Sequence, residues 1–371
     1  RAAAAGAALA AQGAAAASRR QGVRPLRTLA GGLGHEDRLG RSSRVAPLAA
    51  SLLRTQERPS ALPAACRGFS DLITEGHDEG GTLRFSFAAA CLPHPDKAAK
   101  GGEDGYFACP DRHAFGIADG VGGWASNGID PGEFARGLLK FALEVLNATP
   151  KGEEADLQEA LMTSMQRLHE VQLQGGSTAL LGQLTGNTMS ILNLGDSGAI
   201  LLRPALRTPP GSEKPLLFPR VIFRSSDQTH YFNCPYQLGS GNSPIEAPDF
   251  VQVRVRTGDL VVAATDGVFD NLFDHQVQAI VARHLGGAWR SGGPVEPHLQ
   301  GLATNIAKQA QRIGLQEDQK DVITPFALAA HSEGLNFRGG KLDDTTVVVG
   351  LVCNDEGDTG DGEILHNFRD Y

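Results

Sequence analysis

Apolar and polar positions from Leu83 onward follow a pattern that predicts many short strands. Some segments alternate between apolar and polar residues, as half-buried strands do, and others are short continuous apolar runs between turn residues. A tight turn is expected at Gly195-Asp196, and a Thr-Gly-Asp turn is expected inside the segment 250–267. The predicted strand segments are 83–92, 113–119, 177–184, 188–202, 250–267 and 343–352.

Helical spacing of apolar residues separates these strands in two regions. Asp130 followed by Pro131, with Glu133 three residues after Asp130, is typical of a helix start. A second helix is expected at 156–173, where leucines recur at helical spacing. Further helices are predicted at 274–285, with Asp274 as its N-cap, and at 297–312. The Pro-rich segment 203–220 is interpreted as a surface excursion.

The order of these elements favours an α+β fold. Strands, paired helices and then more strands and helices do not give the regular β-α-β alternation of a parallel sheet. Two sheets flanked by helices would bury this much apolar strand. Residues 71–354 are assigned to one folded domain, and the acidic, Gly-rich segment 355–371 is expected to be a flexible tail.

Composition separates the first 70 residues from the rest. Residues 1–70 contain 11 Arg, no Lys and 3 acidic residues within a segment rich in Ala and Ser, the composition of an organelle transit peptide. A disordered low-complexity leader that carries no targeting signal is the alternative. After residue 70, no run of 18 apolar residues occurs, so no transmembrane segment is predicted.

Charge and cysteine content narrow the class of protein. The part after residue 70 has 23 basic and 39 acidic residues, which argues against a nucleic-acid binder and is compatible with a divalent-cation site. The 5 cysteines are widely spaced, and no C-x-x-C occurs. A disulfide framework and structural zinc are therefore disfavoured, and a reducing compartment is favoured.

Acidic residues recur at the ends of the apolar segments. Converging carboxylates would repel one another unless cations neutralise them, and oxygen ligands favour Mg²⁺ or Mn²⁺. Two such ions could lower the pKa of a water molecule and bind a phosphoryl oxygen. Each acid taken alone could equally be a turn or cap residue. These acids are Glu103, Asp104, Asp119, Asp196, Asp266, Asp343 and Asp344.

Six segments in order resemble the motif series of the PP2C (PPM-type) metal-dependent protein phosphatases. They are GGEDGYF (101–107), ADGVGGW (118–124), GSTA (176–179), NLGDSG (193–198), ATDGVFDN (264–271) and LDDTTVVV (342–349). The resemblance spans about residues 83–352. It implies an α/β/β/α sandwich of two antiparallel sheets and hydrolysis of phosphoserine or phosphothreonine in proteins, with no phosphoenzyme. No Cys lies in a C-x5-R arrangement, which disfavours a thiol mechanism.

Other segments are similar to the PTC7-like branch of that family. They include HYFNCPYQL (230–238), TPFALAAHSEG (324–334) and GGKLDDTTV (339–347). Within the branch, the similarity is to the plant and algal photosystem II core phosphatase of chloroplasts. It implies phosphothreonines on photosystem II core subunits as substrates, at the stromal face of thylakoids. The alternative is a mitochondrial-matrix phosphatase, as for other PTC7 relatives.

The resemblance also assigns site residues. It implies that Asp119 bridges two ions and that Asp104 positions water. Asp196 is interpreted as a turn residue rather than a ligand of a further ion, and Asp344, where many relatives have Asn, could exchange roles with Asp343. The implied metal ligands are Glu103, Asp119, the Gly120 carbonyl, Asp266 and Asp343.

Two departures leave part of the chemistry open. Val121 stands where many relatives have a His that could act as a general acid, and Ala99 stands where they have a phosphate-binding Arg. Lys100 or Lys97 could supply the missing positive charge, Lys100 being the assigned candidate. Both departures support an alternative, in which the chain is a pseudophosphatase that binds or regulates without turnover.

Overall fold

The structure is a computed structural model that describes residues 82–150, 153–208, 211, 215–240, 247–355 and 362–369. The predicted leader 1–70 lies outside these residues, as do residues 71–81, so the interpretation of the leader stays a prediction. Among the helices of the described ranges, none has the length and apolar character needed to cross a membrane.

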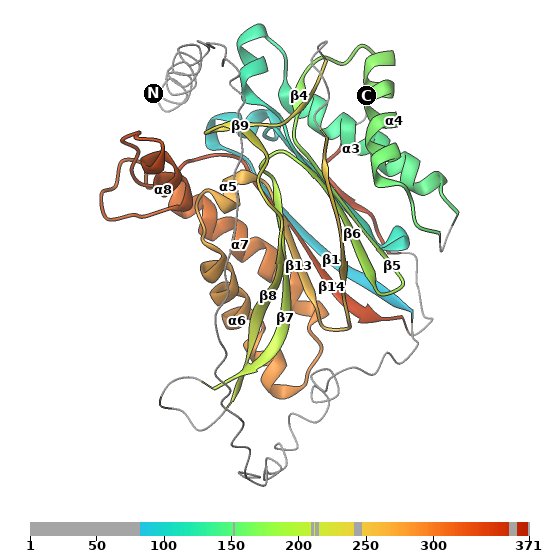
Figure 1. Ribbon diagram of the computed structural model, residues 1–371, viewed down its shortest axis with the longest axis vertical. Helices are drawn as coiled ribbons and strands as arrows, with labels where there is room; N and C mark the ends of the chain where they lie inside the picture. Colours follow the sequence, from blue (N-terminus) through green and yellow to red (C-terminus); the bar gives the residue numbers. More distant parts are fainter. Residues whose placement is uncertain are drawn as a thin grey trace, which may run out of the picture. The chain divides into compact units, whose positions relative to one another are not determined.

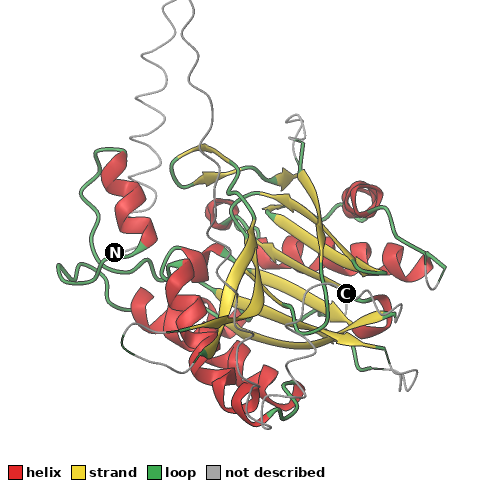
Figure 2. Ribbon diagram, turned by 60° about the horizontal axis from the view of Figure 1, so that its bottom comes forward, coloured by secondary structure: helices red, strands yellow, loops and turns green. Residues whose placement is uncertain are grey.

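Two antiparallel sheets form the centre of the described domain (Figures 1 and 2). The five-stranded sheet has the order β1 (Leu83–Leu92), β14 (Thr345–Asn354), β13 (Leu260–Ala264), β7 (Gly198–Arg207) and β8 (Leu216–Arg224). The six-stranded sheet has the order β12 (Asp249–Arg254), β6 (Thr188–Leu194), β5 (Ala179–Thr185), β3 (Ala114–Asp119), β2 (Asp104–Cys109) and β15 (Leu365–His366). Two short pairs join β9 (Thr229–Tyr231) to β10 (Cys234–Pro235) and β4 (Gly176–Ser177) to β11 (Leu238–Gly239).

Helices cover the outer face of each sheet (Figure 2). Helices α3 (Pro131–Ala148) and α4 (Leu157–Glu170) share one apolar core with the six-stranded sheet. Helices α6 (Asp274–Ser291) and α7 (Leu299–Gly314) share another with the five-stranded sheet. The shorter helices are α5 (Asp266–Phe269), α8 (Pro325–Ser332) and the 3₁₀ turns Pro95–Lys100, Pro110–Arg112, Gly122–Asn127 and Glu296–His298.

A third apolar core lies between the two sheets. Phe85 from β1 and Phe115 from β3 meet edge to face, with 6.3 Å between ring centroids, and both side chains are buried. The three cores define helix, sheet, sheet and helix layers, because each sheet buries one face against the other sheet and one against helices. The predicted α/β/β/α sandwich is confirmed.

Replacing Phe115 by Ala is expected to destabilise the domain by about 3–5 kcal/mol, because the ring fills the space between the sheets. Phe115 lies opposite Gly182, and a Cβ at Gly182 would come within 2.3 Å of that ring. The ring therefore packs directly on the glycine, which has no side chain that could fill the void. Urea unfolding measures the change. The control is Phe250→Ala, at a side chain that is 53% exposed, with an expected loss below about 0.5 kcal/mol. Equal losses for the two variants would contradict this packing.

The helix starts are confirmed in two cases and corrected in one. Asp130 caps α3 by accepting a hydrogen bond from the Gly132 N–H, and Asp156 caps α4 by accepting from the N–H groups of residues 158 and 159. The prediction for Asp274 was wrong, because α6 has Phe273 as its N-cap. There the Gln276 side-chain oxygen accepts the Phe273 N–H at 2.9 Å, so the glutamine reaches back to satisfy the cap.

Two segments expected to be irregular contain strands. The interpretation of 203–220 as a surface excursion was wrong, since β7 continues to Arg207 and β8 begins at Leu216, and the two pair in the five-stranded sheet. Pro204, Pro215 and Pro219 weakened the strand signal. Pro215 immediately precedes the edge strand β8 and Pro219 lies inside it, where proline is tolerated, and Pro204 lies beyond Leu202, the last residue of β7 that pairs with β13.

The expected flexible tail 355–371 also needs correction. Its residues 362–369 are described, and Leu365–His366 pairs with β2 as the edge strand β15. Beyond β15, the Asn367 side chain accepts the Tyr106 N–H and donates to the Asp104 carbonyl, both at 3.0 Å. The amide thus replaces a strand partner for the first residues of β2.

Candidate active site

The acids identified in the sequence come from both sheets and meet at one end of the sandwich. Asp104 is the first residue of β2 and Asp119 the last residue of β3, and the register of these strands places them directly opposite each other. Asp266 follows β13 as the first residue of α5, and Asp343 precedes β14. Opposed like charges destabilise an antiparallel pair, so the facing aspartates need a compensating positive charge.

Asp104 is almost completely buried. Its Oδ2 accepts a hydrogen bond from the Thr265 hydroxyl at 2.9 Å, whereas its Oδ1 is buried without a hydrogen-bond partner among the described residues. Burial, followed by the charge of Asp344, raises the pKa of Asp104 well above its usual value. A hydrogen-bond donor at Oδ1, such as a water molecule, and a nearby cation would relieve both costs.

Asp119 and Gly120 are held at the end of β3 by backbone contacts with the neighbouring 176–178 segment. The Asp119 N–H donates to the Thr178 hydroxyl at 3.0 Å, and its carbonyl accepts the Thr178 N–H at 2.9 Å. Burial, followed by the charges of Asp266 and Asp104, raises the pKa of Asp119. At Gly120, a Cβ would come within 2.5 Å of the Pro131 carbonyl oxygen, so only glycine fits this crossing.

Lys341 occupies the space between three of the acids. Its Nζ lies 2.5 Å from Asp266, 2.7 Å from Asp270 and 3.7 Å from Asp343. Burial raises the pKa of Asp270 to about 7 despite Lys341. Burial would also raise the pKa of Asp343, but the charges of Lys341 and Lys97 outweigh it and hold that pKa below its usual value.

The loop carrying Lys341 is fixed by Asn271. The Asn271 side-chain oxygen accepts the Lys341 N–H at 3.0 Å, and its amide nitrogen donates to the Lys341 carbonyl at 2.7 Å and to the Gly267 carbonyl at 2.9 Å. Because Gly267 belongs to α5, one buried amide joins the helix of Asp266 to the loop of Lys341.

Lys97 makes the second set of ion pairs. Its Nζ lies 2.6 Å from Glu103, 3.3 Å from Asp343 and 3.4 Å from Asp344. Lys100, the assigned phosphate ligand, is exposed. The structure therefore brings Lys97 to the acids, and the role of Lys100 stays a prediction.

Asp343 and Asp344 differ in their surroundings. Asp344 is buried, and its carboxylate accepts the backbone N–H groups of His94 at 2.6 Å and Glu103 at 2.8 Å. These bonds tie the 94–103 loop to the start of β14. Asp343 instead faces both lysine ammonium groups, so it, rather than its neighbour, is open to a cation.

The donor set fits divalent cations, although it is not arranged as a finished metal site. Among the described residues, no group of three or more His, Cys, Asp or Glu side chains has metal-holding geometry. The ammonium groups of Lys97 and Lys341 lie among the carboxylates instead. The Oδ1 atoms of Asp104, Asp196 and Asp266 are buried without a partner within the described ranges. Unpartnered carboxylate oxygens are ligands that Mg²⁺ and Mn²⁺ prefer.

Sequence inspection did not single out Asp270 or Lys341. Asp270 follows Asp266 by four residues across the single turn of α5, and residues at this spacing share a helix face. That spacing could have found Asp270. Lys341 carried no such signal, because its position depends on the long-range contact with Asn271.

Replacing Lys341 by Met is expected to destabilise the metal-free protein by about 3–5 kcal/mol, because the carboxylates of Asp266 and Asp270 lose their cation. Mn²⁺ should restore more of the lost stability in this variant than it adds to the unsubstituted protein. Thermal unfolding in chelator and in Mn²⁺ measures both effects, with the exposed Lys308→Met as control. A chelator-independent loss would contradict the electrostatic explanation.

Comparisons with known proteins identify the family. The chain is 36% identical over 277 residues to Probable protein phosphatase 2C 80 of Arabidopsis thaliana, covering 74% of this chain and 60% of that protein. It is 34% identical over 273 residues to Protein phosphatase PTC7 homolog of Homo sapiens, covering 69% of this chain and 81% of that protein. The chain belongs to the protein phosphatase 2C family.

A solved structure extends the likeness to the fold. The X-ray structure of the photosystem II phosphatase PBCP is 26% identical, with a TM-score of 0.57, over 72% of this chain and 98% of that one. No family model matches the chain. The chain spans between 52% and 60% of the length of three plant relatives that it matches.

Proposed function

We propose that this chain is a Mn²⁺- or Mg²⁺-dependent protein phosphatase that hydrolyses phosphothreonine and phosphoserine. The observation that carries the proposal is the facing pair of the buried Asp104 and the partly buried Asp119, whose pKa values are raised and which lie next to further acids. Such an arrangement costs stability unless cations bind there. Membership of the protein phosphatase 2C family supports the same activity.

The proposed ligands are the carboxylates of Glu103, Asp119, Asp266 and Asp343 and the carbonyl of Gly120. Two bound cations would lower the pKa of water and polarise the phosphoryl group. Asp119 would face both ions from the end of β3. Asp104, fixed by Thr265, would accept a proton from attacking water and hold it at Oδ1.

Lys97 is the best-placed cationic side chain for the substrate phosphate. It lies beside Glu103, the acid that matches the family motif. Its charge would replace that of the phosphate-binding Arg that relatives have at the position of Ala99. An ammonium group binds phosphate as a point charge without the bidentate geometry of a guanidinium. Lys100 is retained as the alternative.

The test is hydrolysis of p-nitrophenyl phosphate and of a phosphothreonine peptide by the full chain, with Mn²⁺ and with chelator. Mn²⁺-dependent turnover that the Asp119→Asn variant lacks is expected. A rate equal to that of the variant would favour the pseudophosphatase, the function suggested by Val121 and Ala99.

The finer proposal concerns substrate and compartment. We infer photosystem II core proteins as substrates in the chloroplast, supported by the likeness to the photosystem II phosphatase and by the composition of residues 1–70. The alternative is the mitochondrial matrix, by similarity to the PTC7 branch. A fluorescent fusion of residues 1–70 separates the two compartments, and thylakoid phosphoproteins test the substrate.

A further inference from the structure

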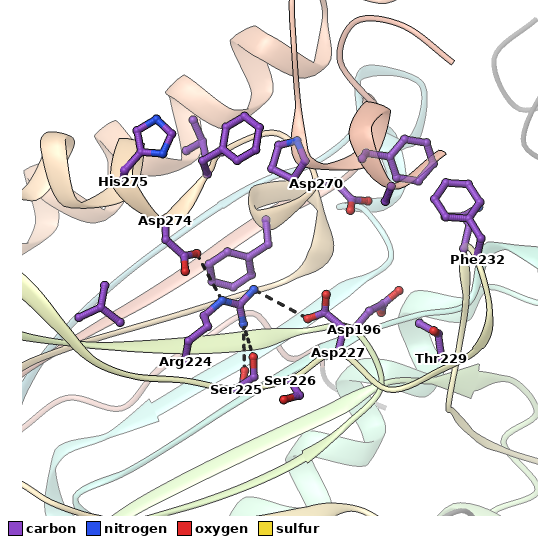
Figure 3. Close-up of a pocket in the computed structure, with 18 of the residues that line it drawn as sticks. Asp196, Arg224, Ser225, Ser226, Asp227, Thr229, Phe232, Asp270, Asp274 and His275 are labelled. Carbon is purple, nitrogen blue, oxygen red and sulfur yellow. Dashed lines mark hydrogen bonds and ion pairs between the residues drawn. The ribbon is translucent and has the colours of Figure 1, made fainter. Parts of the chain in front are cut away.

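A cavity of about 890 Å³ opens beside the acid cluster (Figure 3). It lies between the end of β8, the β9–β10 hairpin, and the starts of α6 and α8. Asp270 lines it, and the same carboxylate holds Lys341, which also contacts Asp266 and Asp343. The cavity is therefore connected to the proposed metal ligands Asp266 and Asp343 through Asp270 and Lys341.

The charges around the cavity are mainly negative. The lining holds four aspartates and one arginine, Arg224, and one of the aspartates, Asp270, is also paired with Lys341, which does not line the cavity; the aspartates are Asp196, Asp227, Asp270 and Asp274. A phosphate group would be repelled here, whereas a cationic group would be attracted. The buried Oδ1 of Asp196 has no hydrogen-bond partner among the described residues, which indicates an unfilled need for a donor.

Arg224 is fixed as part of the wall rather than free to bind an anion. Its guanidinium stacks 4.0 Å from the Phe269 ring centroid and donates to the Ser225 carbonyl at 2.9 Å. Its contacts with Asp274 at 3.4 Å and Asp227 at 3.8 Å are long, and these two side chains are 46% and 56% exposed. Both carboxylates therefore keep oxygen atoms that can accept further donors.

Aromatic rings form another side of the cavity. Phe232 of the β9–β10 turn packs against Phe326 of α8, with 4.9 Å between ring centroids, and both line the cavity with Phe273. A surface that combines rings with carboxylates suits a long basic side chain, whose methylene stem contacts the rings while its charged end reaches the acids.

We propose that this cavity binds a Lys or Arg side chain of the phosphoprotein substrate, close in sequence to the phosphorylated residue. The inference rests on the proposed phosphatase function, because the phosphate must occupy the acid cluster with its cations. An extended peptide advances about 3.3–3.6 Å per residue, so a basic side chain about one to three positions from the phosphoresidue would reach the adjoining cavity.

The experiment compares phosphothreonine peptides in an alanine-rich host, with Arg or Glu placed at each neighbouring position in turn. The measured quantity is the ratio of kcat/KM for the Arg peptide to that for the Glu peptide. The full chain with Mn²⁺ should favour Arg by about tenfold or more at one of these positions, and high salt should reduce the ratio.

Variants of the exposed acids test the location of this preference. Asp274→Asn and Asp227→Asn should each lower the ratio several-fold, and Asp274→Lys should turn it toward the Glu peptide. Glu159→Gln, which removes one exposed charge from α4 on the other sheet, is the matched control and should keep the ratio. Because the two acids lie on different elements, Asp227→Asn serves the test if the α6 variants do not fold.

Three outcomes separate this inference from the proposed function. Mn²⁺-dependent hydrolysis of p-nitrophenyl phosphate and of the peptides without any Arg preference overturns the inference alone. Equal decreases in kcat/KM for the Arg and Glu peptides in the Asp227 and Asp274 variants also overturn it. Absence of Mn²⁺-dependent hydrolysis for every substrate overturns the proposed function, and the inference with it.

Discussion

Replacing Asp119 by Asn is expected to lower Mn²⁺-dependent kcat/KM on p-nitrophenyl phosphate by at least about 100-fold. The amide keeps the size of the side chain but removes the negative charge that two cations would share. Equilibrium dialysis should show weaker Mn²⁺ binding in the same variant. In chelator the variant should have a higher free energy of unfolding than the unsubstituted protein, because the substitution removes a charge that Asp266 and Asp104 repel.

The control for Asp119→Asn is the same substitution at the exposed Asp321. Asp321→Asn should keep both Mn²⁺ binding and turnover. An Asp119→Asn protein that binds and hydrolyses normally would contradict the proposed ligand set. A variant with reduced melting temperature in chelator would contradict the repulsion between the facing aspartates.

The second large expected effect is a pH dependence of stability that Mn²⁺ reverses. Asp104, Asp119, Asp196 and Asp270 have folded-state pKa values above the ordinary 3.8, and that of Asp270 is about 7. The folded protein then binds protons more tightly than the unfolded chain, so these groups lower the free energy of unfolding as the pH rises from about 4 to about 7. Asp343, with a lowered pKa, acts in the opposite direction, but only below about pH 4 and so outside this range.

Divalent cations reverse this pH dependence of the free energy of unfolding, because they bind the deprotonated carboxylates. Mn²⁺ at about 100 times its dissociation constant adds about 2.7 kcal/mol. At a fixed Mn²⁺ concentration the addition should grow with pH, because the dissociation constant falls as the carboxylates lose their protons. Thermal unfolding from about pH 5 to about pH 8, in chelator and in Mn²⁺, measures both slopes. A metal-free protein that becomes more stable across this range would show that the acids are neutralised in another way.

Much of the fold could be predicted from local patterns. The limits of β1, the Asp130 cap and the start of the second helix at residue 156 follow from alternation, N-cap chemistry and helical spacing, which depend on neighbouring residues. The errors at 203–220 and at the tail have another origin. β8 and β15 are edge strands whose pairing is decided by distant partners, and their own sequences carry weak strand signals.

The site was predictable to a similar depth. Acids at strand ends indicated where charge would gather, and motif resemblance supplied their roles. The sequence offered Lys97 only as a candidate for the substrate phosphate, and it did not predict that either lysine pairs with the acids. The contact of Lys97 with Asp343 and that of Lys341 with Asp266 join residues 246 and 75 positions apart in the chain, which no local period encodes. The pairing of Asp344 with backbone N–H groups likewise depends on the 94–103 loop.

The pairing of β15 and Asn367 with β2 has a practical consequence for any recombinant form of the protein. Ending the chain before Leu365 would strip hydrogen bonds from the outer side of the strand that begins with Asp104. Loss of activity after such trimming would then report a loosened support beneath one acid, with every proposed ligand still present.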